Sequence, residues 1–291
     1  MAGRTARRRV QRISLPAQPA SPVRRAERAD LLAAEEPLGI RVGGAALAMT
    51  MRTPGDDIDL AAGFLVSEGI VHSPADIAEI LICSGERCGH AGHSGPDGTD
   101  PGNVADVTLR PGLSVRAELR RNFMTTSACG VCGKTSIAEL SVLSDYDLSA
   151  DRAGVAAQVL AALPDALRAA QRVFDRTGGL HAAGLFTADG KLLAVREDVG
   201  RHNAVDKIVG WALRAGRLPL TGCVLLVSGR ASFELVQKAV LAGIPVLAAV
   251  SAPSSLAAEL AQEAGLTRVG FLRGGSMNVY TGPERVRTGP A

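Results

Sequence analysis

The segment CVLLVSGRASFELVQKAVLAGIPVLAAVSAPSSLAAELAQEAGLTRVGFL, residues 223–272, alternates short apolar runs with longer amphipathic ones. The apolar runs predict buried strands, and the stretches between them have the spacing of helices. Strands that alternate with helices build a mostly parallel sheet with helices on its faces. The expected elements are strands at 223–228, 246–250 and 267–272 and helices at 233–242 and 256–264.

The rest of the chain extends this pattern toward the N-terminus. The pairs Asp189-Gly190 and Gly43-Gly44 both indicate hairpin turns. The other expected elements are hairpin strands at 181–186 and 192–196, a hairpin over 38–52, strands at 77–83 and 104–109, and helices at 56–70, 135–143, 155–176 (broken near Pro164) and 203–214. We therefore predict an α/β fold, a mixed sheet with helices on both faces, and a smaller N-terminal α+β part. The expected divisions are 1–30, 31–125 and 126–291.

Composition limits the class of protein. A hydrophobic fraction of 46% with 21% charged residues is ordinary for a soluble chain of 291 residues. No apolar run reaches the roughly 18 residues of a membrane span, and no signal-peptide pattern is present, so we expect a cytoplasmic protein. The five cysteines are an odd number without disulfide-framework spacing. This count favours a reducing compartment, where cysteines serve chemistry or packing.

The first 30 residues carry eight arginines and two acids, a charge of +6 that leaves −3 on the remaining chain. Three prolines and few large apolar residues predict that this basic tail is disordered. A basic tail can contact nucleic acid or an acidic partner. Because no aromatic residues are interleaved for base stacking, we expect a solvated tail and no nucleic-acid binding.

The motif Cys129-Gly130-Val131-Cys132-Gly133-Lys134 places two thiols in a glycine-bracketed loop before a predicted helix. Free N–H groups at the helix start and the cation of Lys134 favour the thiolate, which is the reactive form. The alternatives are half of a zinc site and two buried structural cysteines. The flanking Ser, Thr, Gly and Lys residues are uncommon in a protein core, so buried structural cysteines are the less favoured alternative. The spacing alone does not separate zinc binding from sulfur chemistry.

Together with other motifs in the same order, this loop resembles the FdhD/NarQ family, the formate dehydrogenase accessory sulfurtransferases. The resemblance runs from about Leu31 to Tyr280. The motifs that carry it are Glu35–Leu38, Met51–Asp57, Ala61–Leu65, Ser127–Lys134, Thr177–Ala183, Arg196–Asn203, Ser228–Glu234, Ser251–Ser255, Gly270-Phe271 and Met277–Tyr280. The resemblance implies a cytidine-deaminase-like fold for the C-terminal part, and a homodimer.

The resemblance also implies an activity. Such proteins accept sulfur from a cysteine desulfurase as a persulfide and pass it to the molybdenum (or tungsten) bis-guanine-dinucleotide cofactor of formate dehydrogenase. Carried over, Cys129 bears the persulfide and Cys132 assists relay or release. The expected dinucleotide contacts are Phe271, Leu272, Arg273, Gly274, Gly275 and Ser276. The molybdenum cofactor is then a bound substrate, and no tightly held metal is expected.

Three predicted strand ends carry small and polar residues: Ser228-Gly229-Arg230, Ser251–Ser255 and Arg273–Ser276. Ligands of open α/β sheets bind beyond such ends, and arginines and backbone N–H groups suit phosphate. We therefore expect a nucleotide site there, against the alternative of ordinary turns and helix caps. His202 lies in the charged run 196–207 and is a candidate for the same site, the alternative being a solvated turn with weak ion pairs. No P-loop or Rossmann motif is present.

Two other functions are considered. A zinc deaminase needs H-x-E or C-x-E and P-C-x-x-C. No proline precedes Cys129, and Ala183 follows His181 where the glutamate belongs, so this function is disfavoured. A non-catalytic carrier or chaperone of the molybdenum cofactor would keep the nucleotide site and tolerate loss of both thiols. Zinc binding by Cys83, Cys88, His90 and His93 is not expected, because their spacing is not that of a standard finger, and Cys223 is expected to be buried.

Overall fold

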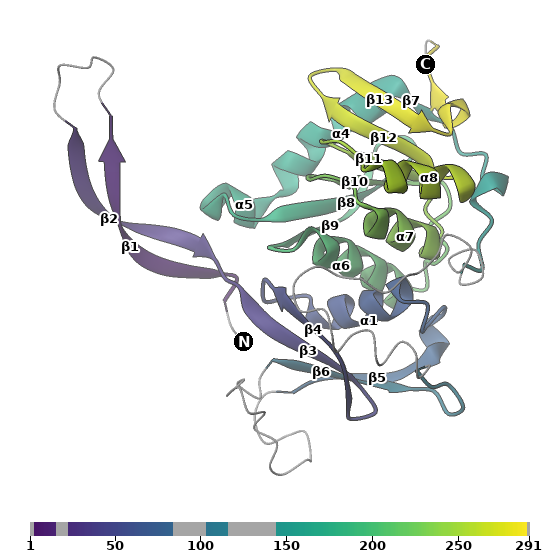
Figure 1. Ribbon diagram of the computed structural model, residues 1–291, viewed down its shortest axis with the longest axis horizontal. Helices are drawn as coiled ribbons and strands as arrows, with labels where there is room; N and C mark the ends of the chain where they lie inside the picture. The colour runs from purple at the N-terminus through teal and green to yellow at the C-terminus, as the bar shows by residue number, and fades with distance from the viewer. Residues whose placement is uncertain (1–2, 16–22, 84–102, 116–143, 290–291) are drawn as a thin grey trace.

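A computed structural model describes residues 3–15, 23–83, 103–115 and 144–289, and all structural statements concern these residues (Figure 1). Cys129, Cys132 and the helix expected at 135–143 lie outside them. No helix within these ranges is long and apolar enough to cross a membrane.

The larger sheet has six strands in the order β13-β12-β11-β10-β8-β9. Neighbours β10, β11 and β12 are parallel, whereas β8, β9 and β13 run antiparallel to their neighbours. The strands are β8 (His181–Thr187), β9 (Leu192–Asp198), β10 (Cys223–Val227), β11 (Val246–Ala249), β12 (Thr267–Arg273) and β13 (Ser276–Thr281). The predicted mixed α/β sheet is therefore confirmed, and β13 adds a strand that was not predicted.

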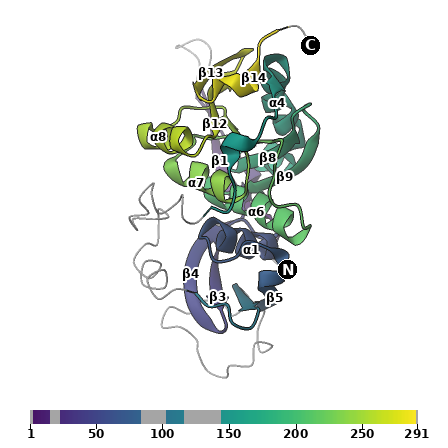
Figure 2. The same cartoon turned by 90° about the vertical axis from the view of Figure 1, so that its right-hand side faces the viewer.

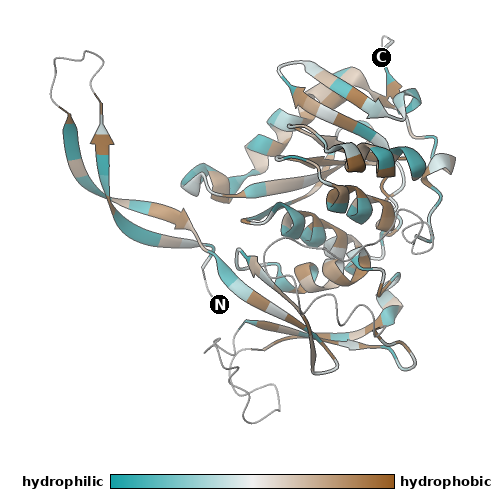
Figure 3. Ribbon diagram, in the orientation of Figure 1, coloured by the Kyte–Doolittle hydropathy of each residue, from teal (hydrophilic) through white to brown (hydrophobic). Residues whose placement is uncertain are grey.

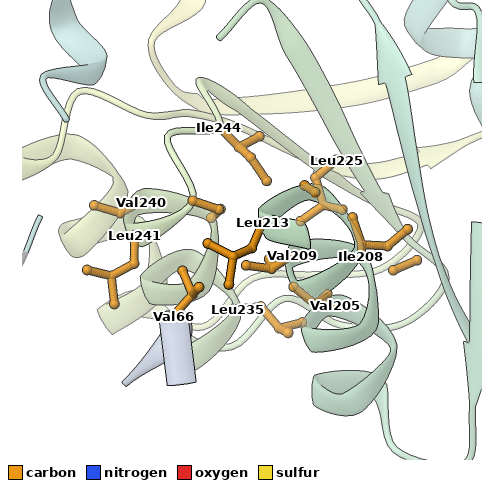
Figure 4. Close-up of a cluster of buried hydrophobic side chains, with 14 of the residues drawn as sticks. Val66, Val205, Ile208, Val209, Leu213, Leu225, Leu235, Val240, Leu241 and Ile244 are labelled. Atoms are coloured by element: carbon orange, nitrogen blue, oxygen red, sulfur yellow. The ribbon is translucent and has the colours of Figure 1, made fainter. Parts of the chain in front are cut away.

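Helices cover both faces of this sheet (Figure 2). The buried leucines of α4 (Ala157–Ala170) share an apolar cluster with Phe186 and Val224 on one face. On the other face lie α6 (Arg201–Arg214), α7 (Phe233–Leu241) and α8 (Ser255–Glu263). Their aliphatic side chains form the main core, part of which is drawn in Figure 4. Burial of each aliphatic side chain contributes about 1.5–3 kcal/mol to the stability of the fold, so these two clusters hold the helices on the sheet.

The expected helix at 155–176 is interrupted, but the position of the break differs from the prediction. Pro164 lies inside α4, and the chain breaks at Gln171 before the short helix α5 (Arg172–Thr177). The carboxylate of Glu197 accepts hydrogen bonds from the backbone N–H groups of Val173 and Phe174, at 2.9 and 2.7 Å. These two bonds satisfy free donors at the start of α5 and hold it against the edge strand β9.

The N-terminal part is a four-stranded sheet with the order β4-β3-β6-β5 and one helix. Its elements are β3 (Glu36–Val42), β4 (Ala45–Arg52), α1 (Asp57–Ser67), β5 (Ile77–Cys83) and β6 (Val104–Leu109). Helix α1 packs closely on α6, because Gly63 and Gly210 bring the two backbones together. Smaller elements are the parallel pair β7 (Val155–Ala156) and β14 (Val286–Arg287), and 3-10 turns at Pro74–Asp76, Leu148–Ala150 and Pro283–Arg285.

The prediction of a disordered N-terminal tail is wrong for the described residues. Strands β1 (Thr5–Ser14) and β2 (Arg24–Ala33) form an antiparallel ribbon with ten paired positions. This ribbon, called the arm below, projects away from both sheets (Figure 1). The composition argument fails here because composition does not register the pairing of β1 with β2 along ten positions, and arginines on an exposed ribbon remain solvated.

Candidate functional site

Several strand ends and helix starts gather at one edge of the six-stranded sheet. The carboxyl ends of the parallel strands β10, β11 and β12 share this edge. Because β8 is antiparallel to β10, its first residue His181 lies there too, opposite Asp198 at the end of β9. Helices α6 and α7 begin just beyond, at Arg201 and Phe233. This is the edge at which α/β sheets bind ligands.

Two of the three segments predicted from the sequence meet at this edge, and Phe271, just before the third, contacts one of them. Ala231, next to Arg230, forms a parallel bridge with Pro253. The backbone N–H of Phe271 donates to the carbonyl of Ser251 at 3.3 Å. The strand-end site is therefore defined by the segments 228–231 and 251–253, the end of β12 at 270–273, and His181 and His202. The site residues themselves remain predictions, since no ligand marks them.

The stretch predicted to contact the dinucleotide forms the end of β12 and its turn into β13. Phe271 has a positive φ of 50°, which is uncommon for a residue with a side chain. The guanidinium of Arg273 lies 5.7 Å from the centre of the Phe271 ring. Gly274 and Gly275 form the turn, with φ values of 58° and 77° that suit glycine. Arg273, Gly274, Gly275 and Ser276 are exposed, whereas the side chain of Leu272 is fully buried in the core.

Ser228 and Gly229 have different local roles. The hydroxyl of Ser228 accepts a hydrogen bond from the N–H of Ala182 at 2.9 Å and so extends the β8–β10 ladder. A Cβ atom on Gly229 would lie 3.3 Å from Nδ1 of His181, so the glycine allows the imidazole to lie close to the loop. Arg230 is exposed. Its cation is therefore available to a ligand at the mouth of the site.

His202 is held by two side chains at the start of α7, those of Ser232 and Glu234. Its Nε2 atom lies 2.5 Å from a carboxylate oxygen of Glu234 and 3.2 Å from the hydroxyl of Ser232. The imidazole and the carboxylate are both partly exposed. Glu234 was not predicted as a site residue, because no local sequence pattern pairs it with a histidine 32 residues earlier. These contacts fix the imidazole at the start of α6 beside the start of α7.

His181 lies beside a group of cationic side chains. Burial lowers its pKa, and the charges of Arg201 and His202 lower it further. Arg201 and His202 begin α6, whose first N–H groups add positive partial charge. Arg230 and Arg273 extend the positive character along the same edge. The arrangement suits an anionic ligand such as a phosphate or diphosphate.

A buried network beneath the site involves the charged run that follows β9. The carboxylate of Asp198 lies 2.7 Å from Nζ of Lys207 and accepts the backbone N–H of Thr53 at 3.1 Å. Both charged side chains are at most 1% exposed. Asn203 donates to Asp198 and to the carbonyl of Met51. The alternative of a solvated turn is therefore wrong here: this network fastens the N-terminal sheet to the start of α6.

A second buried cluster was not predicted. Lys238 on α7 contacts both carboxylate oxygens of Asp206 on α6, at 2.7 and 2.9 Å, and Ser67 donates to the same carboxylate at 2.6 Å. Glu68 follows Ser67 at the end of α1. Burial raises the pKa of Glu68 to about 7, against the opposing charge of Lys238, and Asp206 and Glu234 raise it further. The cluster joins α1, α6 and α7 behind His202.

Within the described ranges, no group of three or more His, Cys, Asp or Glu side chains could hold a metal. Cys88, His90 and His93 lie outside them, so the expectation for that group is untested. Cys83 takes part in a disulfide, contrary to the expectation that the cysteines serve chemistry or packing. Cys223 is buried, as predicted, and burial raises its pKa.

A cavity of about 130 Å³, lined by residues including Gly265 and Gly282, lies at the opposite edge of the sheet from the strand-end site.

Comparisons with known proteins agree with one another. Residues 33–287 match the model of the FdhD/NarQ family. The sulfur carrier protein FdhD of Nocardia farcinica is 56% identical over 289 residues, which cover 99% of this chain and 97% of the relative. The protein of the same name from Streptomyces coelicolor is 59% identical over 261 residues, 89% and 90% of the two chains. A crystal structure from Desulfotalea psychrophila, described as a formate dehydrogenase accessory protein, superposes with a TM-score of 0.68 at 25% identity and covers 96% of this chain and 99% of its own.

Proposed function

Because this chain belongs to the FdhD/NarQ family, we propose that it is a sulfurtransferase of formate dehydrogenase maturation. It accepts sulfur from a cysteine desulfurase as a persulfide on Cys129. It passes this sulfur to the molybdenum bis(molybdopterin guanine dinucleotide) cofactor, which it binds as a substrate. The proposed partners are the desulfurase, formate dehydrogenase and a second copy of the chain.

The observation that carries the proposal is the meeting of three strand ends with the starts of α6 and α7. A bis-guanine-dinucleotide carries several phosphates, and the strand-end site offers cations and helix N-termini to them. Arg230 and Arg273 are exposed at its mouth and are suited to bidentate contact with phosphate. The ring of Phe271 and the planar guanidinium of Arg273 offer flat surfaces on which a guanine base can stack.

The sulfur step is an exchange that needs no external oxidant. The thiolate of Cys129 attacks the outer sulfur of the donor persulfide, a bond forms between Cys129 and that sulfur, and the donor cysteine leaves as a thiolate. Cys132 assists relay or release of the carried sulfur. Lys134 stabilises the thiolate form of the acceptor, because a neighbouring cation lowers the pKa of a thiol.

The sulfur step is tested by intact mass spectrometry after incubation with a cysteine desulfurase and cysteine. We expect the wild-type protein to gain one sulfur atom that reduction removes, and Cys129→Ala to gain none. Cys223→Ala is the matched control, because Cys223 is buried and should not accept sulfur. A correctly folded wild-type chain that gains no sulfur would support the non-catalytic carrier instead.

The binding step is tested separately by calorimetry with GDP as a probe for the nucleotide part of the cofactor. Arg273→Ala and Arg230→Ala should each weaken binding, since each removes a cation at the strand-end site. Arg152→Ala serves as the control, because Arg152 is equally exposed but lies in a different loop. Equal affinity in all four proteins would contradict the assignment of this site.

A further inference from the structure

Arg201, the first residue of α6, has a guanidinium group without a partner. Its Nε atom is buried and forms no hydrogen bond, and no described residue forms an ion pair with its charge. The side chain as a whole is only partly buried, so a ligand can still reach it. Figure 3 shows the end of β9 and the start of α6, where Arg201 lies, as hydrophilic. A buried donor without an acceptor is costly, because it has lost water and gained no protein hydrogen bond.

Two other arginines of low exposure show what such a side chain ordinarily has. The guanidinium of Arg52 lies 3.0 Å from the carboxylate of Asp57. The guanidinium of Arg196 lies 2.9 Å from the carboxylate of Asp59. Both cations are thus neutralised within the chain. Arg201 has no carboxylate of this kind among the residues that the structure describes, so its charge is available to an anion from outside.

The carboxylates at this edge of the sheet are engaged elsewhere. Asp198 accepts four hydrogen bonds, from two side chains and two backbone N–H groups. Glu197 accepts two backbone N–H groups at the start of α5. Glu234 contacts His202. The strand-end site therefore presents the charge of Arg201 without a carboxylate of its own to neutralise it.

Arg201 lies over the end of β10, inside the strand-end site. A Cβ atom on Gly229 would lie 3.9 Å from Cδ of Arg201 and 3.3 Å from Nδ1 of His181, so both side chains lie against this glycine. Burial lowers the pKa of His181, and the charge of Arg201 lowers that pKa further. A lowered pKa favours the neutral imidazole at neutral pH, so the cation at the end of β10 is Arg201.

The stacking surface and this cation lie at different strands of the same edge. Phe271 and Arg273 are at the end of β12, and β11 separates them from Gly229 at the end of β10. Neighbouring strands are about 4.8 Å apart, so the two strand ends are separated by roughly 10 Å. An extended nucleoside diphosphate spans a comparable distance between its base and its second phosphate. One nucleotide can therefore reach both places.

We propose that Arg201 binds the diphosphate of the guanine dinucleotide, whose base stacks at Phe271 and Arg273. The assignment rests on the proposed binding of the cofactor, but not on the sulfur step. The fork of the guanidinium presents parallel N–H groups to phosphate oxygens, which are the acceptors that Arg201 lacks in the free protein. Because a partly buried charge is screened less by salt than an exposed one, Arg201 contributes more to phosphate recognition than the exposed Arg230.

The test compares GDP, GMP and guanosine as competitors of a fluorescent GDP on the full-length chain. The wild type should bind GDP more tightly than GMP, and GMP more tightly than guanosine. Arg201→Ala should weaken GDP binding at least roughly tenfold and leave guanosine binding unchanged, so the preference for GDP disappears. Arg214→Ala is the matched control, since it removes the same charge from the other end of α6, and it should keep the wild-type preference.

A second variant separates loss of the contact from loss of the fold. Arg201→Lys keeps the charge but not the fork, so it should bind GDP more weakly than the wild type and more tightly than Arg201→Ala. Unchanged guanosine binding shows that each variant is folded. If the wild type binds GDP and both variants keep its preference for GDP over guanosine, the role of Arg201 is overturned while the nucleotide site stands. If the wild type binds none of the three compounds, the proposed cofactor binding is overturned together with the role of Arg201.

Discussion

The crossing of α1 and α6 yields the sharpest stability prediction. A Cβ atom on Gly63 would lie 1.8 Å from the backbone carbonyl oxygen of Asp206, and one on Gly210 would lie 1.8 Å from the carbonyl oxygen of Asp59. Ordinary contact begins near 3.4 Å, so either alanine is about 1.6 Å too close. Because the neighbour is helix backbone rather than a flexible side chain, the two helices must move apart.

The cost follows from what this movement would disturb. Overpacking a core costs about 1–3 kcal/mol, and occasionally more. Separation of the helices would also strain the buried contacts of Asp206 with Ser67 and Lys238. Alanine favours a helix over glycine by about 0.5–1 kcal/mol, which offsets only part of this. We therefore expect Gly63→Ala to lower the free energy of unfolding by about 2–3 kcal/mol and the thermal midpoint by roughly 5–10 °C.

The assay is urea unfolding followed by circular dichroism, with the midpoint concentration compared between variants. Gly39→Ala is the matched control, because its Cβ would meet its nearest neighbours at 3.7 Å, an ordinary contact distance. It should change stability by less than about 1 kcal/mol. If Gly63→Ala and Gly210→Ala were both as stable as Gly39→Ala, the proposed close approach of the helices would be refuted.

Three further predictions concern buried charges and a helix cap. Lys207→Met leaves the carboxylate of Asp198 buried without its cation, so thermal unfolding should show a loss of about 3–5 kcal/mol. Glu68 has a raised pKa of about 7, so the folded state holds its proton more tightly, and the stability of the wild type falls as the pH rises from about 4.5 to 7. Glu68→Gln should therefore gain stability relative to the wild type between pH 5 and pH 8, measured by urea unfolding at both pH values. A difference in stability that is the same at both pH values would contradict the raised pKa. Ser254→Ala removes the side-chain acceptor for the N–H of Ala257 and should cost about 1 kcal/mol by the same thermal measurement, whereas Ser254→Asp should retain the cap.

Sequence periodicity predicted most elements of the two sheets well, because their strands bury continuous or alternating apolar residues. The expected strands at 77–83 and 104–109 coincide with β5 and β6. The arm was missed because the prediction used composition, whereas its structure depends on pairing between β1 and β2. Strand β13 was missed because its exposed residues leave only a weak apolar pattern. The break at Gln171 was displaced because Pro164 is accommodated inside α4.

The candidate site was predictable only in part. The three strand ends follow from topology, since parallel strands bring their carboxyl ends to one edge. The partners of the charged residues do not follow from local sequence. Lys238 and Asp206 are 32 residues apart, and Ser67 lies 139 residues from Asp206. Such pairs depend on how α1, α6 and α7 pack, which no local pattern specifies.

The hydrogen bonds of Thr53 to Asp198 and Lys207 have a consequence for how the chain can be divided. The predicted boundary between residues 125 and 126 would leave α1 without α6, and Asp198 without its backbone donor. A fragment cut there would expose the apolar face of α1, and the buried Asp198–Lys207 pair would lose the backbone N–H and carbonyl of Thr53. In native-state hydrogen exchange, the amides of β4 and α6 should therefore open together as one cooperative unit, and separate expression of the two parts should yield no folded N-terminal fragment.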